Sequence, residues 1–263
     1  METDPTAPDP MQPTWPSTAL VVGGSRGIGR QAVIQLAGRG VHCAIGYQSR
    51  TKLAEEVAAE ASRLGPEPVL VQGDQGTDPR AFVEATVEAL GGCGSVVTTA
   101  VPMLMGRLLD VTADDYRAAM DVQVWGLQEL VRAALPHLEA DQGSVVTVSS
   151  LGAGSYASYY GAIGPAKGAL ETTVRYFGAE LGKRGVRVNA VSPCLVDDPS
   201  HTIGIDVPET FQAVIDAVAR RTPLRRLATS VEIASVIVAL LSSSFRFVTG
   251  QVIPVDGGYS LLA

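Results

Sequence analysis

Short runs of β-branched and other apolar residues recur along the chain, and stretches of helical pattern lie between them. Residues 19–22 (ALVV) predict a strand, and residues 27–39 predict a helix that follows it. Residues 41–47 (VHCAIGY) predict the next strand, and residues 51–65 an amphipathic helix that ends at a glycine. Further strands are predicted at 68–72, 95–99, 144–150, 186–192 and 251–255.

This alternation indicates the fold class. Helical segments long enough for crossover connections separate most of the strands, which favours parallel pairing. The strands are almost continuously apolar, as in a sheet that helices cover on both faces. We therefore predict an α/β fold with a single doubly wound, Rossmann-type parallel sheet and helices on both faces. Its ligand crevice would lie beyond the carboxyl ends of the strands.

Composition limits the domain organisation. The chain has 263 residues, of which 46% are hydrophobic, and this suits one sizeable domain. Residues 1–17 contain five prolines and have little to bury. We therefore predict a disordered, proline-rich tail at 1–17 and a single folded domain at 18–263.

Charge and residue types argue against several classes of partner. The net charge of −7 argues against nonspecific nucleic-acid binding. No apolar run reaches membrane-spanning length and the N-terminus has no signal pattern, so we expect no membrane association and a cytoplasmic location. The cysteines and histidines are too scattered for a disulfide framework or a metal site, and we expect no metal. They are Cys43, Cys93, Cys194, His42, His137 and His201.

The first predicted strand runs into the sequence GGSRGIG, and a predicted helix follows. Glycines at such a turn let the backbone approach a pyrophosphate, and the helix N-terminus favours its negative charge. The sequence therefore predicts that this loop binds a dinucleotide. The residues assigned to the loop are Gly23, Ser25, Arg26, Gly27, Ile28 and Gly29.

The end of the second predicted strand decides which dinucleotide binds. An acidic residue there would bind the ribose hydroxyls of NAD and repel a 2′-phosphate. This chain instead has Tyr47 at that position, followed by Ser49 and Arg50. The guanidiniums of Arg26 and Arg50, together with a hydroxyl, suit a phosphate. NADPH is therefore the expected cofactor; the alternative is that these are ordinary surface arginines.

Several motifs together resemble the short-chain dehydrogenase/reductase family over residues 18–263. They are GGSRGIG, Asp74 after the third strand, VSS at 148–150, Lys167, RVNAVSP at 187–193 and GQVIPVDGG at 250–258. The resemblance implies a homo-oligomer, either a tetramer or a dimer, and a substrate-covering segment at about 195–222. It also implies further cofactor contacts at Asp74, Gln75, Thr99, Ala100, Lys167, Pro193 and Val196.

The segment around Lys167 resembles a narrower group, the enoyl-acyl-carrier-protein reductases, in which a tyrosine precedes the lysine by seven residues. Tyr160 and Lys167 have this spacing, whereas Ile163 occupies the position of the family's usual catalytic tyrosine. The resemblance implies a catalytic set of Tyr160, Lys167, Ser150 and Tyr156. It implies an NADPH-dependent reductase of enoyl thioesters on acyl carrier protein or coenzyme A, in fatty-acid or polyketide biosynthesis.

A displaced tyrosine makes chemical sense. Tyr160, Ile163 and Lys167 would lie on one face of a helix, so the hydroxyl moves by one turn, on the order of 5 Å. An enoyl thioester accepts hydride at its β-carbon, far from the carbonyl oxygen that collects charge, and a displaced acid fits this longer acceptor. Pro165 limits the argument, because a helix that begins near 164 would leave Tyr160 in the preceding loop.

Other positions depart from the family pattern and leave alternatives open. Gln123 falls at the asparagine of the family's proton relay, Asp198 replaces a threonine, and TTAV at 98–101 replaces Asn-Asn-Ala-Gly. The alternatives are an atypical carbonyl reductase of the same family and a non-redox member, namely an isomerase, dehydratase, cyclase or binding protein. Four arginines suit either carrier phosphates or structural roles: Arg220, Arg221, Arg225 and Arg226.

Overall fold

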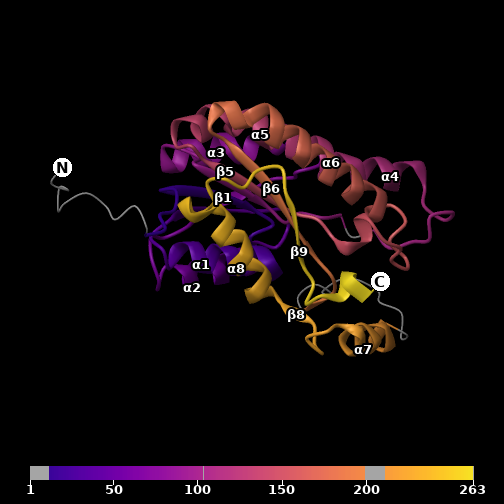
Figure 1. Cartoon of the computed structure of the whole chain (residues 1–263). Coiled ribbons are helices and arrows are strands. Elements are labelled where there is room, and N and C mark those ends of the chain that lie inside the picture. The colour runs from indigo at the N-terminus through magenta and orange to yellow at the C-terminus, as the bar shows by residue number, and fades with distance from the viewer. Residues whose placement is uncertain (1–11, 103, 199–210, 263) are drawn as a thin grey trace.

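The computed structural model describes residues 12–102, 104–198 and 211–262. Its centre is a parallel sheet of seven strands in the order β3-β2-β1-β4-β5-β6-β9 (Figure 1). The predicted doubly wound parallel sheet is therefore confirmed. The strands are β1 (Thr18–Val22), β2 (His42–Tyr47), β3 (Val69–Gln72), β4 (Ser95–Thr98), β5 (Ser144–Val148), β6 (Arg187–Pro193) and β9 (Val252–Val255).

Helices cover both faces of the sheet, because successive strand residues point to opposite sides (Figure 1). In β1, Ala19 and Val21 join one buried apolar cluster, and Leu20 and Val22 join the other. The helices packed on the first cluster are α1 (Gly27–Ala37), α2 (Thr51–Ala61) and α8 (Ser230–Leu241). Those packed on the second are α3 (Pro79–Leu90), α5 (Gly126–Ala140) and α6 (Ile163–Leu181). Among the described residues, no helix combines the length and hydropathy that a membrane span requires.

The strand predictions hold to within two residues at every end. The two helix predictions hold at their starts, but the helices end earlier, at Ala37 and Ala61. The first ends early because the chain turns through Gly40, which has φ of 79°. A second, two-stranded sheet pairs β7 (Val196–Asp197) with β8 (Ala228–Thr229), and strands of two residues are too short to leave a hydrophobic pattern.

The predicted disordered tail at 1–17 is too long. Residues 1–11 lie outside the described residues, but Trp15 packs against the core beside α8. Its Nε1 donates a hydrogen bond to the Val238 carbonyl at 3.1 Å, and the Arg39 guanidinium lies 5.1 Å from its ring centroid. Thr14 and Ser243 also exchange hydrogen bonds. The prolines disfavour regular structure, but they do not prevent an indole from docking.

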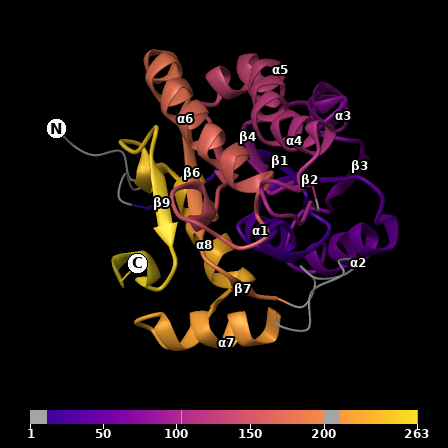
Figure 2. The ribbon, with the colours of Figure 1, turned by 90° about the vertical axis from the view of Figure 1, so that its right-hand side faces the viewer.

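The chain after β4 adds elements around the carboxyl ends of the strands. Helix α4 (Ala113–Met120) runs into α5 through a π-helical segment, Asp121–Trp125. Helix α7 (Phe211–Arg221) lies below the sheet beside the C-terminal segment (Figure 2). The predicted substrate-covering segment at 195–222 includes β7 and α7, but its part from 199 to 210 lies outside the described residues.

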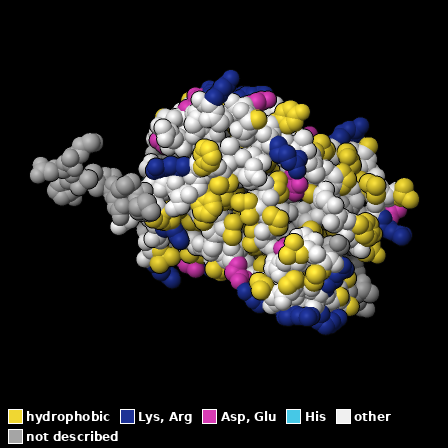
Figure 3. Space-filling view, in the orientation of Figure 1, with side chains coloured by type: hydrophobic (Ala, Val, Ile, Leu, Met, Phe, Trp, Pro, Cys, Tyr) yellow, Lys and Arg dark blue, Asp and Glu magenta, His cyan; other side chains and the backbone are white. Residues whose placement is uncertain are grey.

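Strand β9 forms one edge of the large sheet. The face of the molecule that carries this edge presents several hydrophobic side chains to solvent (Figure 3). Phe247 and Leu261, which precede and follow β9 in the chain, are both exposed.

Candidate active site

The glycine loop between β1 and α1 forms a cradle that no side chain could occupy. Gly23 has φ of 82°, and a Cβ added there would lie 2.4 Å from Thr99 Oγ1. A Cβ on Gly29 would lie 2.2 Å from the Gly23 carbonyl oxygen. The N–H groups of Gly23 and Gly24 donate to the Gly46 carbonyl at 2.9 and 3.0 Å, which ties the loop to β2. The open backbone at the start of α1 fits the pyrophosphate of a dinucleotide.

Two arginines lie together beside this loop. Burial, and then the charge of Arg50, lower the pKa of Arg26, whereas the carboxylate of Asp198 raises it. Tyr47, the last residue of β2, is buried, and Ser49 is exposed two residues after it. A bound anion would relieve the repulsion between the two guanidiniums. The geometry therefore suits a phosphate group.

The other predicted cofactor contacts lie at the same edge of the sheet. Asp74 Oδ1 accepts a hydrogen bond from the Gly76 N–H at 2.7 Å, and its Oδ2 accepts one from Gln48 Nε2 at 2.5 Å. Thr99 Oγ1 donates to the Val22 carbonyl at 3.3 Å, which joins the end of β4 to that of β1. Of the remaining positions, Ala100 lies just after β4, Pro193 is the last residue of β6, and Val196 is the first residue of β7.

Gln75 differs from its neighbours, because its side chain lies inside the protein and is only 5% exposed. Its Nε2 donates to the Val122 carbonyl at 2.7 Å, and its Oε1 accepts from Thr98 Oγ1 at 2.6 Å. The predicted cofactor contact at Gln75 stays a prediction, and the amide atoms already have these two protein partners. The sequence offers no local signal for this inward orientation.

Lys167 is buried under the end of β5. Its Nζ donates to the Val148 carbonyl and to Gln123 Oε1, each at 2.6 Å. Burial lowers its pKa to about 7, and the nearby carboxylate of Glu171 opposes that shift. Since an ammonium carries three N–H donors, these two bonds leave one for a ligand at the mouth of the site.

Tyr160 lies in a turn just before α6, and a distant loop fixes this turn. The Gly106 N–H donates to the Tyr159 carbonyl, and the Gly161 N–H donates to the Gly106 carbonyl, each at 2.9 Å. These bonds form a single bridge between positions 106 and 160. This course of the backbone gives Tyr159 a φ of 59°, which is a strained value for a residue with a side chain.

The hydroxyls of Tyr160 and Ser150 are paired. Burial raises the pKa of Tyr160, and its side-chain hydrogen bond with Ser150 lowers it. Ser150 Oγ also accepts from the Gly152 N–H at 3.2 Å, which fixes the serine. A Cβ on Gly152 would lie 2.7 Å from the Tyr160 ring, so the ring packs directly on that backbone. Three of the four predicted catalytic residues, Tyr160, Ser150 and Lys167, therefore lie around the end of β5.

The argument that placed Tyr160, Ile163 and Lys167 on one helix face is wrong in its geometry. Helix α6 begins at Ile163, so Tyr160 lies in the preceding turn. The Gly164 N–H still donates to the Tyr160 carbonyl at 2.7 Å, so the turn leads directly into the helix. Pro165 is the third helical residue, and in the first turn its missing N–H interrupts no helical bond.

The structure separates the other tyrosines from this cluster. Tyr156 is 89% exposed, so the structure does not bring it to Tyr160 and Ser150. Tyr159 is also exposed. Ile163, at the family's usual tyrosine position, is 2% exposed and packs with Ala119, Ala162 and Ala166. An apolar wall therefore stands where a tyrosine hydroxyl would otherwise be.

The four arginines near the C-terminus have largely structural partners. Arg226 forms a two-point ion pair with Glu232, at 2.7 and 2.6 Å. Arg221 donates to the Leu262 carbonyl and lies over the Tyr259 ring. Arg225 donates to the Arg220 carbonyl at 2.5 Å. No cluster of three or more His, Cys, Asp or Glu side chains suited to a metal occurs in the described ranges, and His201 lies outside them.

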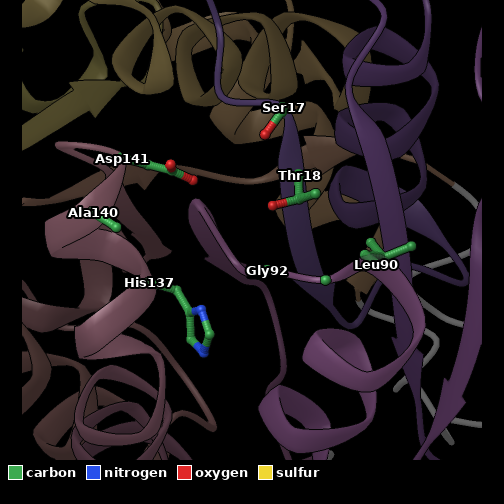
Figure 4. Close-up of a pocket in the computed structure, with 8 residues that line it drawn as sticks. Ser17, Thr18, Leu90, Gly92, His137, Ala140 and Asp141 are labelled. Atoms are coloured by element: carbon green, nitrogen blue, oxygen red, sulfur yellow. The ribbon is translucent and has the colours of Figure 1, made fainter.

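A crevice of about 210 Å³ lies at the opposite end of the sheet (Figure 4). Ligands of doubly wound sheets bind beyond the carboxyl ends of the strands, whereas this crevice adjoins the start of β1. It is therefore separate from the candidate active site. Its lining residues are Ser17, Thr18, Leu90, Gly91, Gly92, His137, Ala140 and Asp141.

A glycine cradle, with a buried lysine and a tyrosine near the end of the same strand, at the carboxyl edge of a doubly wound sheet, is the arrangement of a nicotinamide-dependent oxidoreductase. Residues 22–260 match the family described as Enoyl-(Acyl carrier protein) reductase. The chain is 34% identical over 245 residues to the short-chain dehydrogenase/reductase FrzI of Cladobotryum sp, covering 91% of this chain and 94% of that protein. The chain therefore belongs to the short-chain dehydrogenase/reductase family.

Two further similarities concern chemistry. The chain is 32% identical over 253 residues to 1-cyclohexenylcarbonyl-CoA reductase of Streptomyces collinus, covering 93% of this chain and 87% of that protein. The solved structure of the angucycline C-6 ketoreductase LanV with bound NADP superposes with a TM-score of 0.84 at 29% identity, covering 93% and 96% of the two chains. Family membership alone therefore does not distinguish reduction of an enoyl thioester from reduction of a ketone.

Proposed function

We propose that the protein is an NADPH-dependent enoyl-thioester reductase. The observation that carries this proposal is the arrangement around the end of β5. A partly buried Tyr160 is hydrogen-bonded to Ser150, while the usual tyrosine position holds the buried apolar Ile163. The similarity to a reductase that acts on a cyclohexenylcarbonyl thioester supports it.

Each residue of the site has a role in this reaction. Tyr160 donates a hydrogen bond to the thioester carbonyl and stabilises the enolate oxygen that forms there. Ser150 orients the tyrosine hydroxyl through their hydrogen bond. Lys167, when charged, lowers the proton affinity of the tyrosine. The α-carbon then receives its proton from Tyr160 or from water.

The glycine loop and the residues beside it would hold the cofactor. The loop takes the pyrophosphate, Arg26, Ser49 and Arg50 take the 2′-phosphate, and Asp74 lies on the adenine side. Lys167 would bind the nicotinamide ribose with its remaining N–H. When bound, NADPH supplies the hydride that reduces the β-carbon. The bound NADP of LanV supports a preference for the phosphorylated cofactor.

The proposed substrate is an acyl thioester carried by acyl carrier protein or coenzyme A. Apolar side chains surround the loop that bridges to Tyr160, as an acyl chain requires. The exposed members of this rim are Val101, Met105, Leu108 and Leu109, and Met103 lies outside the described residues. We also propose a homo-oligomer, a tetramer or a dimer, because apolar side chains gather on the face of the β9 edge (Figure 3).

A substrate comparison tests the proposed function. The purified protein would be mixed with NADPH and, in parallel, with 1-cyclohexenylcarbonyl-CoA, a linear 2-enoyl-CoA and the matching β-ketoacyl-CoA. We expect NADPH oxidation with the enoyl thioesters and little with the ketone. Faster oxidation with the ketone would favour an atypical carbonyl reductase. Tight NADPH binding without oxidation of any of them would favour a non-redox member.

A further inference from the structure

The helix that carries Gln123 is locally unwound. Between α4 and α5, Asp121–Trp125 is π-helical, and the Gly126 N–H donates to the Asp121 carbonyl, five residues back. In a regular α-helix this N–H would donate to the Val122 carbonyl, four residues back. Such π-helical insertions often occur at functional sites, because they redirect one side chain.

The redirected side chain is that of Gln123, which is buried. Its Oε1 accepts from Lys167 Nζ at 2.6 Å, and its Nε2 donates to the Ala100 carbonyl at 2.9 Å. Gln123 therefore links the lysine of the active site to the backbone just after β4. A shift of the π-helical segment would move one of the two acceptors of the ammonium.

Gln75, which is not part of this helix, forms a hydrogen bond to the π-helical segment. Its Nε2 donates to the Val122 carbonyl, the acceptor that the Gly126 N–H bypasses, at 2.7 Å. Its Oε1 accepts from Thr98 Oγ1 at 2.6 Å, which anchors the amide to β4. Both ends of one buried side chain are therefore satisfied, and they join the sheet to the π-helical segment.

Gly126 supplies an independent observation on the same contact. A Cβ at this position would lie 2.6 Å from the Gln75 carbonyl oxygen and 2.8 Å from Gln75 Cγ. The glycine is therefore required by the close approach of Gln75 and not by its backbone conformation, since no positive φ occurs there. Gln75 and the helix are packed directly on each other.

We infer that Gln75 is a positioning residue that clamps the π-helical segment to β4 and thereby holds Gln123 on Lys167. The inference rests on the proposed reductase function only for its kinetic readout. Without the amide, the Val122 carbonyl and the Thr98 hydroxyl lose buried partners, and the segment can relax toward a regular helix. Gln123 would then withdraw from the ammonium, which lowers the stability of its charged form.

The test uses Gln75→Met, which keeps the length of the side chain and removes both hydrogen bonds. The Nζ resonances of 15N-labelled, cofactor-free protein are titrated with pH. Assignment is direct because the chain has three lysines, Lys52, Lys167 and Lys183, and Lys167→Met removes one signal. We expect the pKa of Lys167 to fall by about one unit relative to the wild type. The same protein should lose at least about tenfold in kcat on an enoyl thioester, with KM within about twofold.

Thr98→Val breaks the other end of the clamp. It removes the anchor on Gln75 Oε1 and leaves the bond to the Val122 carbonyl, so the pKa of Lys167 and kcat should change in the same direction as in Gln75→Met, but by less. A wild-type Lys167 titration in Gln75→Met would overturn the inference, even if its thermal stability falls. If Gln75→Met does not fold, Gln75→Asn decides, because it withdraws the amide by one methylene. An unchanged pKa of Lys167 in that variant would overturn the inference equally.

The titration also separates this inference from the proposed function. Glu171, the carboxylate that opposes the pKa shift of Lys167, is the same in every variant. A change in the pKa of Lys167 therefore reflects the loss of the Gln75 contacts. If the wild type reduces no enoyl thioester, the proposed function fails, but the Lys167 titration still tests the clamp. If the wild type is active and Lys167 titrates in Gln75→Met as it does in the wild type, the inference about Gln75 fails and the proposed function stands.

Discussion

The glycine loop and the Tyr160 turn both lead into a helix at the carboxyl edge of the sheet, but the contacts that hold them come from different parts of the chain. The glycine loop joins adjacent elements, and its N–H groups bond to the neighbouring strand β2. The Tyr160 turn depends on Gly106, a residue more than fifty positions earlier, and on the Ser150 hydroxyl. The first is held by backbone bonds to an adjacent strand, and the second by backbone bonds to a distant loop together with a side-chain contact.

This difference separates what the fold requires from what the reaction requires. A cradle made of backbone accepts the same pyrophosphate whatever the substrate is, so it changes little when chemistry changes. An acid held by loop contacts can occupy a different position in the chain without altering the sheet. Variants that disturb each region should therefore fail in different ways, in binding for the first and in turnover for the second.

The largest effect is expected for Gly29→Ala. The new Cβ would lie 2.2 Å from the Gly23 carbonyl oxygen and 2.8 Å from Thr99 Oγ1, so the whole loop must move. We expect the Kd for NADPH to rise at least about 100-fold, or ~2.7 kcal/mol, together with a lower Tm. Fluorescence titration and thermal unfolding measure these. Gly182→Ala is the control, because its Cβ would meet no atom within 4 Å, and it should be nearly silent.

Tyr160→Phe should separate turnover from binding. The variant removes one hydroxyl and leaves the ring on Gly152, so folding should survive. We expect kcat on an enoyl thioester to fall by one to three decades, on the order of 1.4–4 kcal/mol for one lost transition-state donor. The Kd for NADPH should hardly change. Steady-state kinetics and a binding titration check both.

Two neighbouring tyrosines provide controls for that variant. Tyr159→Phe and Tyr156→Phe each remove an exposed hydroxyl, and both should retain nearly full activity. Full activity in Tyr160→Phe combined with its loss in Tyr156→Phe would show that the catalytic assignment fails. The family assignment would be unaffected by that result.

The same contrast explains which features the sequence predicts. Strands such as Val145–Val148 are visible because apolar periodicity is local, and the glycine loop is visible because a strand, three glycines and a helix follow one another. The spacing of Tyr160 and Lys167 identifies the pair through the family resemblance, but places the tyrosine on a helix that begins only at Ile163.

Features that depend on contacts between distant segments were not predictable. The bridge from Gly106 to Tyr160 and the inward amide of Gln75 each join residues far apart in the chain. The π-helical segment before Gly126 also leaves no periodicity, since a single wide turn shifts the apolar pattern by one residue. Such features require the folded structure.

A smaller effect is expected on stability as a function of pH. Lys167 has a pKa of about 7 in the folded protein, below its ordinary value of 10.5, because burial disfavours the charge. Between these values the unfolded chain binds the additional proton, so the free energy of unfolding should rise with pH from 7 upward. The wild type should gain roughly 1–3 kcal/mol between pH 7 and 9 relative to Lys167→Met. Urea unfolding of the cofactor-free proteins measures this.

The comparison with Lys167→Met is needed because other groups titrate in the opposite direction. Burial raises the pKa of Cys43 and of Cys93 to about 12, above the ordinary value of 9.0. Their thiolates would therefore stabilise the unfolded chain above pH 9 in both proteins, and this effect cancels in the difference. Parallel pH dependences for the two proteins would show that Lys167 is charged in the folded state throughout this range.

The smallest effect concerns the choice of cofactor. Arg50 lies close to Arg26 just after β2, where Tyr47 takes the place of an acidic residue, so its charge should favour the 2′-phosphate. Arg50→Ala should raise the Kd for NADPH about tenfold, or ~1.4 kcal/mol, and leave the Kd for NADH nearly unchanged. Arg63→Ala, which removes an exposed arginine just after α2, is the matched control. Equal affinities of the wild type for NADPH and NADH would remove the basis of this assignment, because the two cofactors differ only in the phosphate that the arginines are proposed to bind.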